Sequence, residues 1–181
     1  MSNYRRAWTK GGCFFFTVVT HDRRPWLCAP AARTVLRHAI ETVRRKHPFR
    51  IDAWVLLPDH LHCIWTLPDG DVDFSLRWRL IKLITSRQYG DRVTSTINVS
   101  RRKRGETGLW QRRFWEHRIR DGADFSAHCD YIHYNPVRHG LCLKPWEWPY
   151  STFRRFVEQG IYPSDWGTAA APTIGEKTGR E

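Results

Sequence analysis

The sequence predicts an α+β domain with a ferredoxin-like central antiparallel β-sheet and flanking helices. Its apolar patterns follow the order strand, helix, strand, strand, helix, strand, which is the split βαβ plan. A length of 181 residues with 41% hydrophobic residues suits one domain with a substantial core. We expect that domain to span 1–166 and the small, polar residues 167–181 to form a mobile tail.

The first half of the chain contains three strands and one helix. Residues 14–20 are almost all apolar or β-branched and predict a central strand. Apolar residues at helical spacing predict a helix over 31–46, which Pro48 ends. Alternation predicts a strand over 49–57, and a tight turn then leads into a strand over 60–67, so these two should form an antiparallel hairpin.

The second half begins with an amphipathic helix over 74–89 that presents Leu76, Leu80, Leu83 and Ile84 on one face. Residues 90–108 are polar and basic and predict a flexible loop. A fourth strand over 113–119 follows, and then a helix over about 124–134 that can cover an edge or the other face of the sheet. Residues 145–160 predict a further helical hairpin rich in aromatic residues.

The charge of the chain favours a polyanionic partner. Lysine and arginine number 30 against 18 acidic residues, a formal charge of +12, so nucleic acid is the first candidate and an anionic membrane surface the second. No apolar run approaches the ~18 residues of a membrane span, and no signal peptide is evident, so a cytoplasmic protein is expected. The five cysteines form no CxxC pair and are expected to be reduced thiols.

Two histidines share one face of the strand over 60–67. Because side chains alternate along a strand, His60 and His62 project together while Cys63 points to the other face. Two neighbouring imidazoles can bind one metal ion, or they can be a solvated pair of polar residues. With one more oxygen ligand, an open site of this kind suits Mg²⁺ or Mn²⁺.

A second group of candidate residues lies in "DYIHYNPVRHGL", residues 130–141. Tyr131 and Asn135 are four apart and share a helix face if the helix persists, but Pro136 disfavours helical geometry at Asn135. A tyrosine hydroxyl can attack a phosphodiester that a metal polarises. Tyr131 and Tyr134 can equally be packing residues of the core.

The segment 101–120 combines basic and aromatic residues. It holds seven arginines and one lysine against two glutamates, with Trp110, Phe114 and Trp115 among them. Such a segment can be a solvated surface, but guanidinium and indole groups together suit phosphate contacts and base stacking. With two N-terminal arginines, the candidate DNA-binding residues are Arg5, Arg6, Arg101, Arg102, Lys103, Arg104, Arg112, Arg113, Arg118 and Arg120.

These features resemble a known family, the REP-associated tyrosine transposases, which are relatives of the single-tyrosine HUH transposases of small bacterial insertion sequences. The resemblance covers most of the chain and rests on "YRRAWTKGGCFFFTV", "AWVLLPDHLHCIWTLPDGD", "WQRRFWEHRIR", "DYIHYNPVRHGL" and "WPYSTFRRF". It implies an HUH endonuclease fold in which paired histidines bind a divalent metal and a tyrosine on a following helix attacks single-stranded DNA. Residues 101–104 have no counterpart in the family pattern.

Carried over residue by residue, the resemblance implies that His60, His62 and Asn135 bind Mg²⁺ or Mn²⁺ and that Tyr131, rather than Tyr134, is the nucleophile. Attack would release a 3′-hydroxyl and leave a 5′-phosphotyrosine link, and a second 3′-hydroxyl could reverse the reaction to join new ends. The implied partner is single-stranded DNA beside a hairpin, as in repetitive extragenic palindromes. A monomer bound to the bacterial nucleoid is expected, with a dimer as the alternative.

Two other classes of protein fit the same residues. A non-catalytic nucleic-acid-binding regulator could use the exposed aromatics of a ferredoxin-like sheet, with structural histidines. A metal-dependent hydrolase that activates water would keep His60 and His62 but would not need Tyr131. A covalent adduct between protein and DNA distinguishes the transposase from both.

Overall fold

A computed structural model describes residues 11–93, 108–169 and 171–172 of the 181-residue chain. Its strands and main helices are β1 (Gly11–Val19), α1 (Pro30–Lys46), β2 (Arg50–Leu56), β3 (His60–Asp69), α2 (Phe74–Tyr89), β4 (Trp115–Arg118), α4 (Gly122–Arg138) and α5 (Phe153–Glu158). Short 3-10 turns lie at His21–Arg23, Gly90–Arg92 and Pro145–Glu147.

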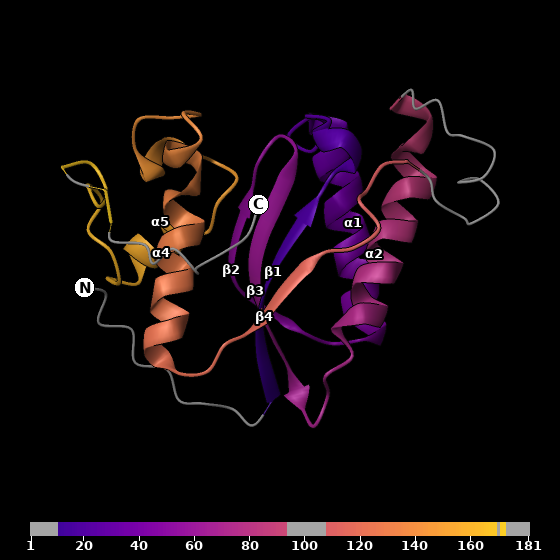
Figure 1. Cartoon of the computed structure of the whole chain (residues 1–181), viewed down its shortest axis with the longest axis horizontal. Coiled ribbons are helices and arrows are strands. Elements are labelled where there is room, and N and C mark those ends of the chain that lie inside the picture. Colours follow the sequence, from indigo (N-terminus) through magenta and orange to yellow (C-terminus); the bar gives the residue numbers. More distant parts are fainter. Residues whose placement is uncertain (1–10, 94–107, 170, 173–181) are drawn as a thin grey trace.

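The four strands form one antiparallel sheet in the order β2-β3-β1-β4. This order is that of a ferredoxin-like sheet and confirms the predicted fold class. In Figure 1, α1 and α2 lie side by side on one side of the sheet, and α4 and α5 lie on the other. The predicted helix after the fourth strand therefore covers the second face rather than an edge. Strand β4 is shorter than the predicted 113–119.

Alternation along the central strands builds a separate core on each face of the sheet. Phe16 and Trp65 pack toward α1 and α2, where the indoles of Trp65 and Trp78 stack with centroids 4.1 Å apart. Phe15 and Ile64 pack instead toward α4 and α5. A sheet buried on both faces gives its central strands few exposed positions, so polar residues there need specific partners.

The helix α1 begins and packs as its sequence predicts. Pro30 occupies the first turn, where the missing N–H costs no hydrogen bond. Burial follows the predicted apolar stripe, since the fully or nearly fully buried residues are Ala32, Leu36, Ala39, Ile40 and Val43.

The helix α2 has the predicted bounds, but its buried face is rotated from the predicted one. Leu83 is 38% exposed, whereas Trp78 and Ile81 are fully buried beside Arg77. Arg77 can occupy the core because its guanidinium binds Asp71 at 2.6 Å and donates to several backbone carbonyls. A buried cation whose donors are satisfied can take the place of an apolar residue on a packed helix face. The positions of the leucines alone therefore do not indicate which face of α2 is buried.

The helix α4 continues through Pro136, so the predicted loss of helical geometry at Asn135 is wrong. The helix runs to Arg138, and the N–H of His139 still donates to the carbonyl of Asn135 at 3.0 Å. Proline removes one donor from the last turns of a helix, and Pro136 is accommodated there as a buried residue. Asn135 therefore keeps its helical position relative to Tyr131.

Residues 145–160 form less helix than predicted. A 3-10 turn at Pro145–Glu147 and the six-residue α5 are separated by a segment that pairs with the free edge of β2. There, the N–H of Leu56 donates to the carbonyl of Tyr150, and the N–H of Thr152 donates to the carbonyl of Trp54. Pairing with an edge strand satisfies backbone groups that water would otherwise bind, and this outweighs the helical pattern of the segment.

Some predictions lie outside the described residues. They concern the interior of the loop 90–108, most of the tail, and the basic residues Arg5, Arg6, Arg101, Arg102, Lys103 and Arg104. The extent of the single domain, 1–166, stays a prediction. Within the ranges that are described, no helix combines the length and apolar character needed to cross a membrane.

Candidate active site

The candidate site lies on the face of the sheet that α4 covers. His60 and His62 begin β3, and they pair with Val19 and Thr17 of β1. On its other side β3 pairs with β2. Hydrogen bonds to neighbouring strands on both sides hold the backbone of the two histidines. The sequence prediction that the pair shares one face is borne out by the geometry, but both side chains are at most 1% exposed, so they are not a solvated pair.

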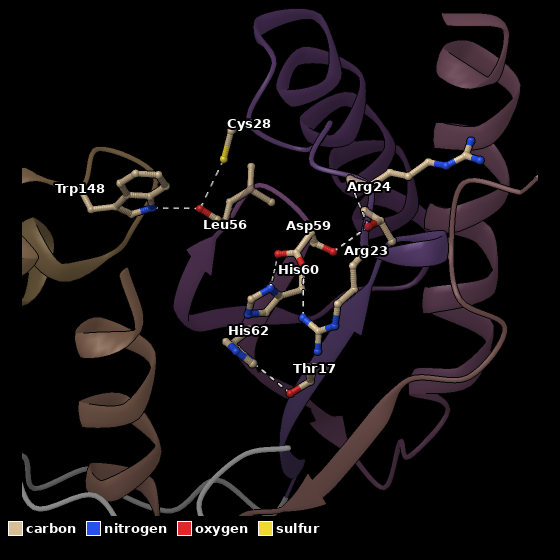
Figure 2. A network of polar contacts seen from close by, with 10 residues as sticks. Thr17, Arg23, Arg24, Cys28, Leu56, Asp59, His60, His62 and Trp148 are labelled. Atoms are coloured by element: carbon tan, nitrogen blue, oxygen red, sulfur yellow. Dashed lines mark hydrogen bonds and ion pairs between the residues drawn. The ribbon is translucent and has the colours of Figure 1, made fainter. Parts of the chain in front are cut away.

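Each histidine ring is oriented through its Nδ1 atom. Thr17 Oγ1 lies 2.9 Å from Nδ1 of His62, and a carboxylate oxygen of Asp59 lies 2.7 Å from Nδ1 of His60 (Figure 2). The ring centroids are 4.9 Å apart. With Nδ1 engaged in both rings, Nε2 is the nitrogen that each histidine can offer to a metal ion.

Asp59 is held as a carboxylate. Its partial burial would raise the pKa, but the hydrogen bond with His60 and the interaction with Arg23, 3.1 Å away, lower the pKa below its ordinary value. A carboxylate hydrogen-bonded to a histidine raises the basicity of that ring, as in many metal sites of proteins. Asp59 therefore supports His60 as a ligand, a role that the sequence prediction did not assign.

Helix α4 places Tyr131 against His62. The Tyr131 ring lies 5.0 Å from the His62 ring and 5.9 Å from the Phe15 ring, centroid to centroid, and the residue is 1% exposed. Asn135 lies one helical turn further on and is fully buried. The fold thus brings Tyr131 against His62 and places Asn135 on the same face of the helix as Tyr131.

Two cationic or titratable residues near this site were missed by the sequence prediction. The guanidinium of Arg138 lies 5.6 Å from the centroid of the Tyr131 ring, and the ring of His139 lies 5.1 Å from that of His60. Both follow Tyr131 by seven or eight residues, a helical spacing that could have indicated them. The expected end of the helix at Pro136 concealed that spacing.

Contacts at the N-terminal end of α4 hold this helix in place. The N-cap Asp121 accepts a hydrogen bond from the N–H of Asp124 at 2.8 Å. Asp124 in turn accepts from His117 of β4 at 2.9 Å and from the backbone and side chain of Arg120. Burial would raise the pKa of Asp124, but these hydrogen bonds lower it to about 2.

The group of His117, Asp124 and His128 has residue types that bind metals, with its candidate ligand atoms within 4.8 Å of one another. Hydrogen bonds join its members to one another, because His117 Nε2 lies 2.9 Å from the carboxylate of Asp124 and His128 Nδ1 lies 2.8 Å from the carbonyl of Asp124, while Nε2 of His128 is buried with no hydrogen-bond partner among the described residues. We therefore interpret this group as the network that ties β4 to α4.

Contacts further along α4 join it to the C-terminal part of the chain. His133 Nε2 lies 2.9 Å from Thr152 Oγ1, and Thr152 is bound to Trp54 of β2. The hydroxyl of Tyr162 donates to Asp130 at 2.6 Å. These contacts flank Tyr131 and hold its helix against the sheet.

The described members of the predicted DNA-binding set lie on or near the edge strand β4. All four are exposed, and Arg120 also pairs with Asp124 at 3.2 Å. The four described members are Arg112, Arg113, Arg118 and Arg120.

Comparisons with known proteins identify the family of the chain. A family model described as "Transposase IS200 like" matches residues 13–135. The chain is 49% identical over 166 residues to the REP-associated tyrosine transposase of Escherichia coli (strain K12), covering 92% of this chain and 91% of that protein. It is 44% identical over 167 residues to a putative REP-associated tyrosine transposase of Haemophilus influenzae (strain ATCC 51907 / DSM 11121 / KW20 / Rd), covering 92% and 94%.

A solved structure of a REP-associated tyrosine transposase bound to a REP hairpin superposes with a TM-score of 0.76 at 45% identity. The match covers 100% of this chain and 98% of the other. The sequence and fold comparisons agree over nearly the whole length, and the family model agrees over residues 13–135. The chain therefore belongs to the REP-associated tyrosine transposases, within the IS200-like transposase family.

Proposed function

We propose that this protein cleaves and rejoins single-stranded DNA beside palindromic hairpins through a covalent 5′-phosphotyrosine intermediate. The observation that carries the proposal is the 5.0 Å between the rings of Tyr131 and His62, on a face that also holds His60. A nucleophile beside two potential metal ligands is the arrangement that phosphoryl transfer requires.

The proposed metal ligands are Nε2 of His60, Nε2 of His62 and the amide oxygen of Asn135. Their chemistry fits a divalent ion, because the Nδ1 contacts with Asp59 and Thr17 direct the other ring nitrogen to coordination. Two nitrogens and one oxygen leave coordination positions open for phosphate, which suits Mg²⁺ or Mn²⁺. Such an ion would act as a Lewis acid on the scissile phosphate.

In the proposed reaction the hydroxyl oxygen of Tyr131 attacks the phosphorus and loses its proton. The bond from phosphorus to the 3′ oxygen breaks, so a 3′-hydroxyl leaves and the 5′-phosphate stays on the tyrosine. Because one phosphodiester replaces another, a second 3′-hydroxyl can reverse the step and join new ends. The guanidinium of Arg138, 5.6 Å from the Tyr131 ring, would stabilise negative charge on the phenolate and the phosphate.

The proposed partner is hairpin DNA with an adjoining single strand, as in repetitive extragenic palindromes. Support comes from the similarity over its full length to a transposase that was solved with a REP hairpin, and from the formal charge of +12. We propose that the arginines along β4, together with the N-terminal and loop residues predicted from the sequence, bind DNA phosphates. We further propose a monomer that acts on the DNA of the bacterial nucleoid.

The test is to incubate labelled hairpin DNA carrying single-stranded extensions with the protein and Mg²⁺ or Mn²⁺, and to detect covalent adducts in denaturing gels. Wild type should form an adduct that chelation of the metal prevents. Tyr131→Phe should form none, while the matched control Tyr134→Phe should form it as wild type does, because Tyr134 packs against Trp166 instead. An adduct formed by Tyr131→Phe would exclude the proposed nucleophile.

The same assay separates the two alternative functions. Cleavage without an adduct would indicate a hydrolase that activates water. Hairpin binding without cleavage under any metal would indicate a nucleic-acid-binding regulator. Cleavage retained by His60→Ala/His62→Ala would exclude the proposed metal ligands.

A further inference from the structure

A cationic groove lies along the outer edge of the sheet, away from the DNA-binding arginines proposed on β4. It has a volume of about 1020 Å³ and is lined by residues of α1, of β2 and of the segment 149–159. Its two acidic residues are Glu41 and Asp52, and Asp52 already binds Arg50 at 2.8 Å. Its five arginines are Arg33, Arg37, Arg44, Arg50 and Arg155.

Two of the groove arginines, Arg33 and Arg44, are held in place through Nε and keep donors for a ligand. Arg33 donates Nε–H to the carbonyl of Cys28 at 3.2 Å and lies 4.4 Å from the ring centroid of Tyr150. Arg44 donates Nε–H to the carbonyl of Phe49 at 3.0 Å. A guanidinium has five N–H donors, so these contacts orient each side chain and leave the terminal nitrogens for phosphate oxygens.

The dimensions of the groove fit one strand of nucleic acid. β2 advances six residues from Arg50 to Leu56, which is about 20 Å at ~3.3 Å per residue. Over that length the groove has a volume of about 1020 Å³ between α1, β2 and the segment 149–159. The half-buried rings of Trp54 and Tyr150 lie among the arginines, as in sites where aromatic side chains stack on unpaired bases.

One end of the groove adjoins the candidate active site. Leu56 lines the groove and binds Tyr150 through its N–H at 2.8 Å. Leu57, the next residue, donates its N–H to the carbonyl of His60 at 2.9 Å. Figure 2 shows Leu56, with the Trp148 indole bonded to its carbonyl, next to Asp59 and His60. The end of the groove at Leu56 therefore lies at the β2–β3 hairpin that carries His60.

We propose that this groove binds the single-stranded DNA that extends from the cleavage site, over at most about six nucleotides at ~3.4 Å each. The proposal rests on the proposed function, because it extends the same substrate beyond the catalytic residues. It assigns a separate surface to the unpaired strand, leaving the hairpin stem to the arginines on and near β4.

The experiment measures equilibrium binding by fluorescence anisotropy without divalent metal, so that no cleavage occurs. The ligands are a REP-type hairpin that is blunt and the same hairpin with a six-nucleotide extension on its 5′ or its 3′ side. The variant is Arg37→Gln/Arg44→Gln, which removes two groove cations. The matched control is Arg79→Gln/Arg87→Gln, which removes two exposed cations from α2.

The groove variant should bind one of the extended hairpins roughly tenfold more weakly than wild type. The slope of log K against the logarithm of the salt concentration should become smaller in magnitude by about 1.4, because two phosphate contacts are lost. Its affinity for the blunt hairpin should match that of the α2 control. Equal losses for blunt and extended hairpins would overturn the proposal, as would equal losses for the two variants. Failure of the proposed function would instead appear as a wild type that forms no adduct.

Photocrosslinking gives an independent measurement on the unmodified chain. Extended hairpins carrying 5-iodouracil in the unpaired strand should crosslink to Trp54 or Tyr150, identified by mass spectrometry of the digested protein. Crosslinks that map only outside the groove would overturn the proposal even if the affinities changed as expected.

Discussion

Replacing Thr17 by valine removes a hydroxyl that lies within hydrogen-bond distance of Nδ1 of His62. The two atoms are 2.9 Å apart, and Thr17 is 2% exposed, so water cannot readily take the place of the hydroxyl. Valine keeps the branched shape that suits the central strand β1. We expect Thr17→Val to fold and to lose the orientation of the His62 ring.

The size of the effect follows from the position of Thr17 behind a metal ligand. Loss of a hydrogen bond of this kind costs about 10- to 100-fold in metal affinity or activity, or about 1.4–2.7 kcal/mol. The assay is the Mn²⁺ concentration that gives half-maximal adduct formation on hairpin DNA. It should rise about 10- to 100-fold, with the rate at saturating Mn²⁺ changed less.

A matched control lies on the other side of the sheet. Thr85 of α2 is fully buried, and its hydroxyl has no hydrogen-bond partner among the described residues. Thr85→Val makes the same chemical change without touching a histidine and should leave the Mn²⁺ dependence unaltered. If Thr17→Val shifts the half-maximal Mn²⁺ concentration less than twofold, Thr17 does not orient a metal ligand and the reasoning is refuted.

Three further predictions concern α4. Arg138→Gln should lower the rate of adduct formation about 10-fold or more at saturating DNA while hairpin affinity changes little, because the cation lies beside Tyr131. Asp121→Ala removes the N-cap of α4 and should lower the free energy of unfolding by about 1 kcal/mol, measured in urea. Burial lowers the pKa of His133 from 6.5 to about 3, so the unfolded state binds more protons between these values and stability should fall as the pH drops through that window. His133→Leu should reduce the slope of the unfolding free energy against pH in that window by up to about 1.4 kcal/mol per pH unit.

Each of these predictions has an outcome that contradicts it. Arg138→Lys should restore part of the rate, whereas a rate of Arg138→Gln equal to that of wild type would exclude the electrostatic role. Equal stability of Asp121→Ala and wild type would show that the cap does not hold α4. An unchanged pH slope in His133→Leu would show that His133 is not buried as a neutral ring.

Much of the fold could be predicted from the sequence because the relevant signals are local. The period of two along β3 places His60 and His62 on one face whatever packs above them. The stripe of α1 determines which of its residues enter the core. The order of the elements leaves few compact topologies, and the observed sheet is the one expected.

Local signals failed where packing over long sequence distances decides the outcome. Proline at 136 is a helix-ending signal within its own segment, but α4 is packed against the sheet and continues to Arg138. Residues 148–152, which include Trp148 and Tyr150, are predicted as helix, but the open edge of β2 pairs with them instead. The buried face of α2 depends on the charge pair of Arg77, which the apolar pattern cannot indicate.

By itself the sequence determined that two imidazoles share a strand face, that the chain is strongly cationic and that a tyrosine and an asparagine lie four residues apart. Tertiary structure decided that Tyr131 lies against His62, that Thr17 and Asp59 orient the rings, and that five arginines line one groove. The physical reason is the range of each effect. Side-chain direction follows from the backbone of a few residues, whereas a site is made by contacts between segments that only the packed core brings together.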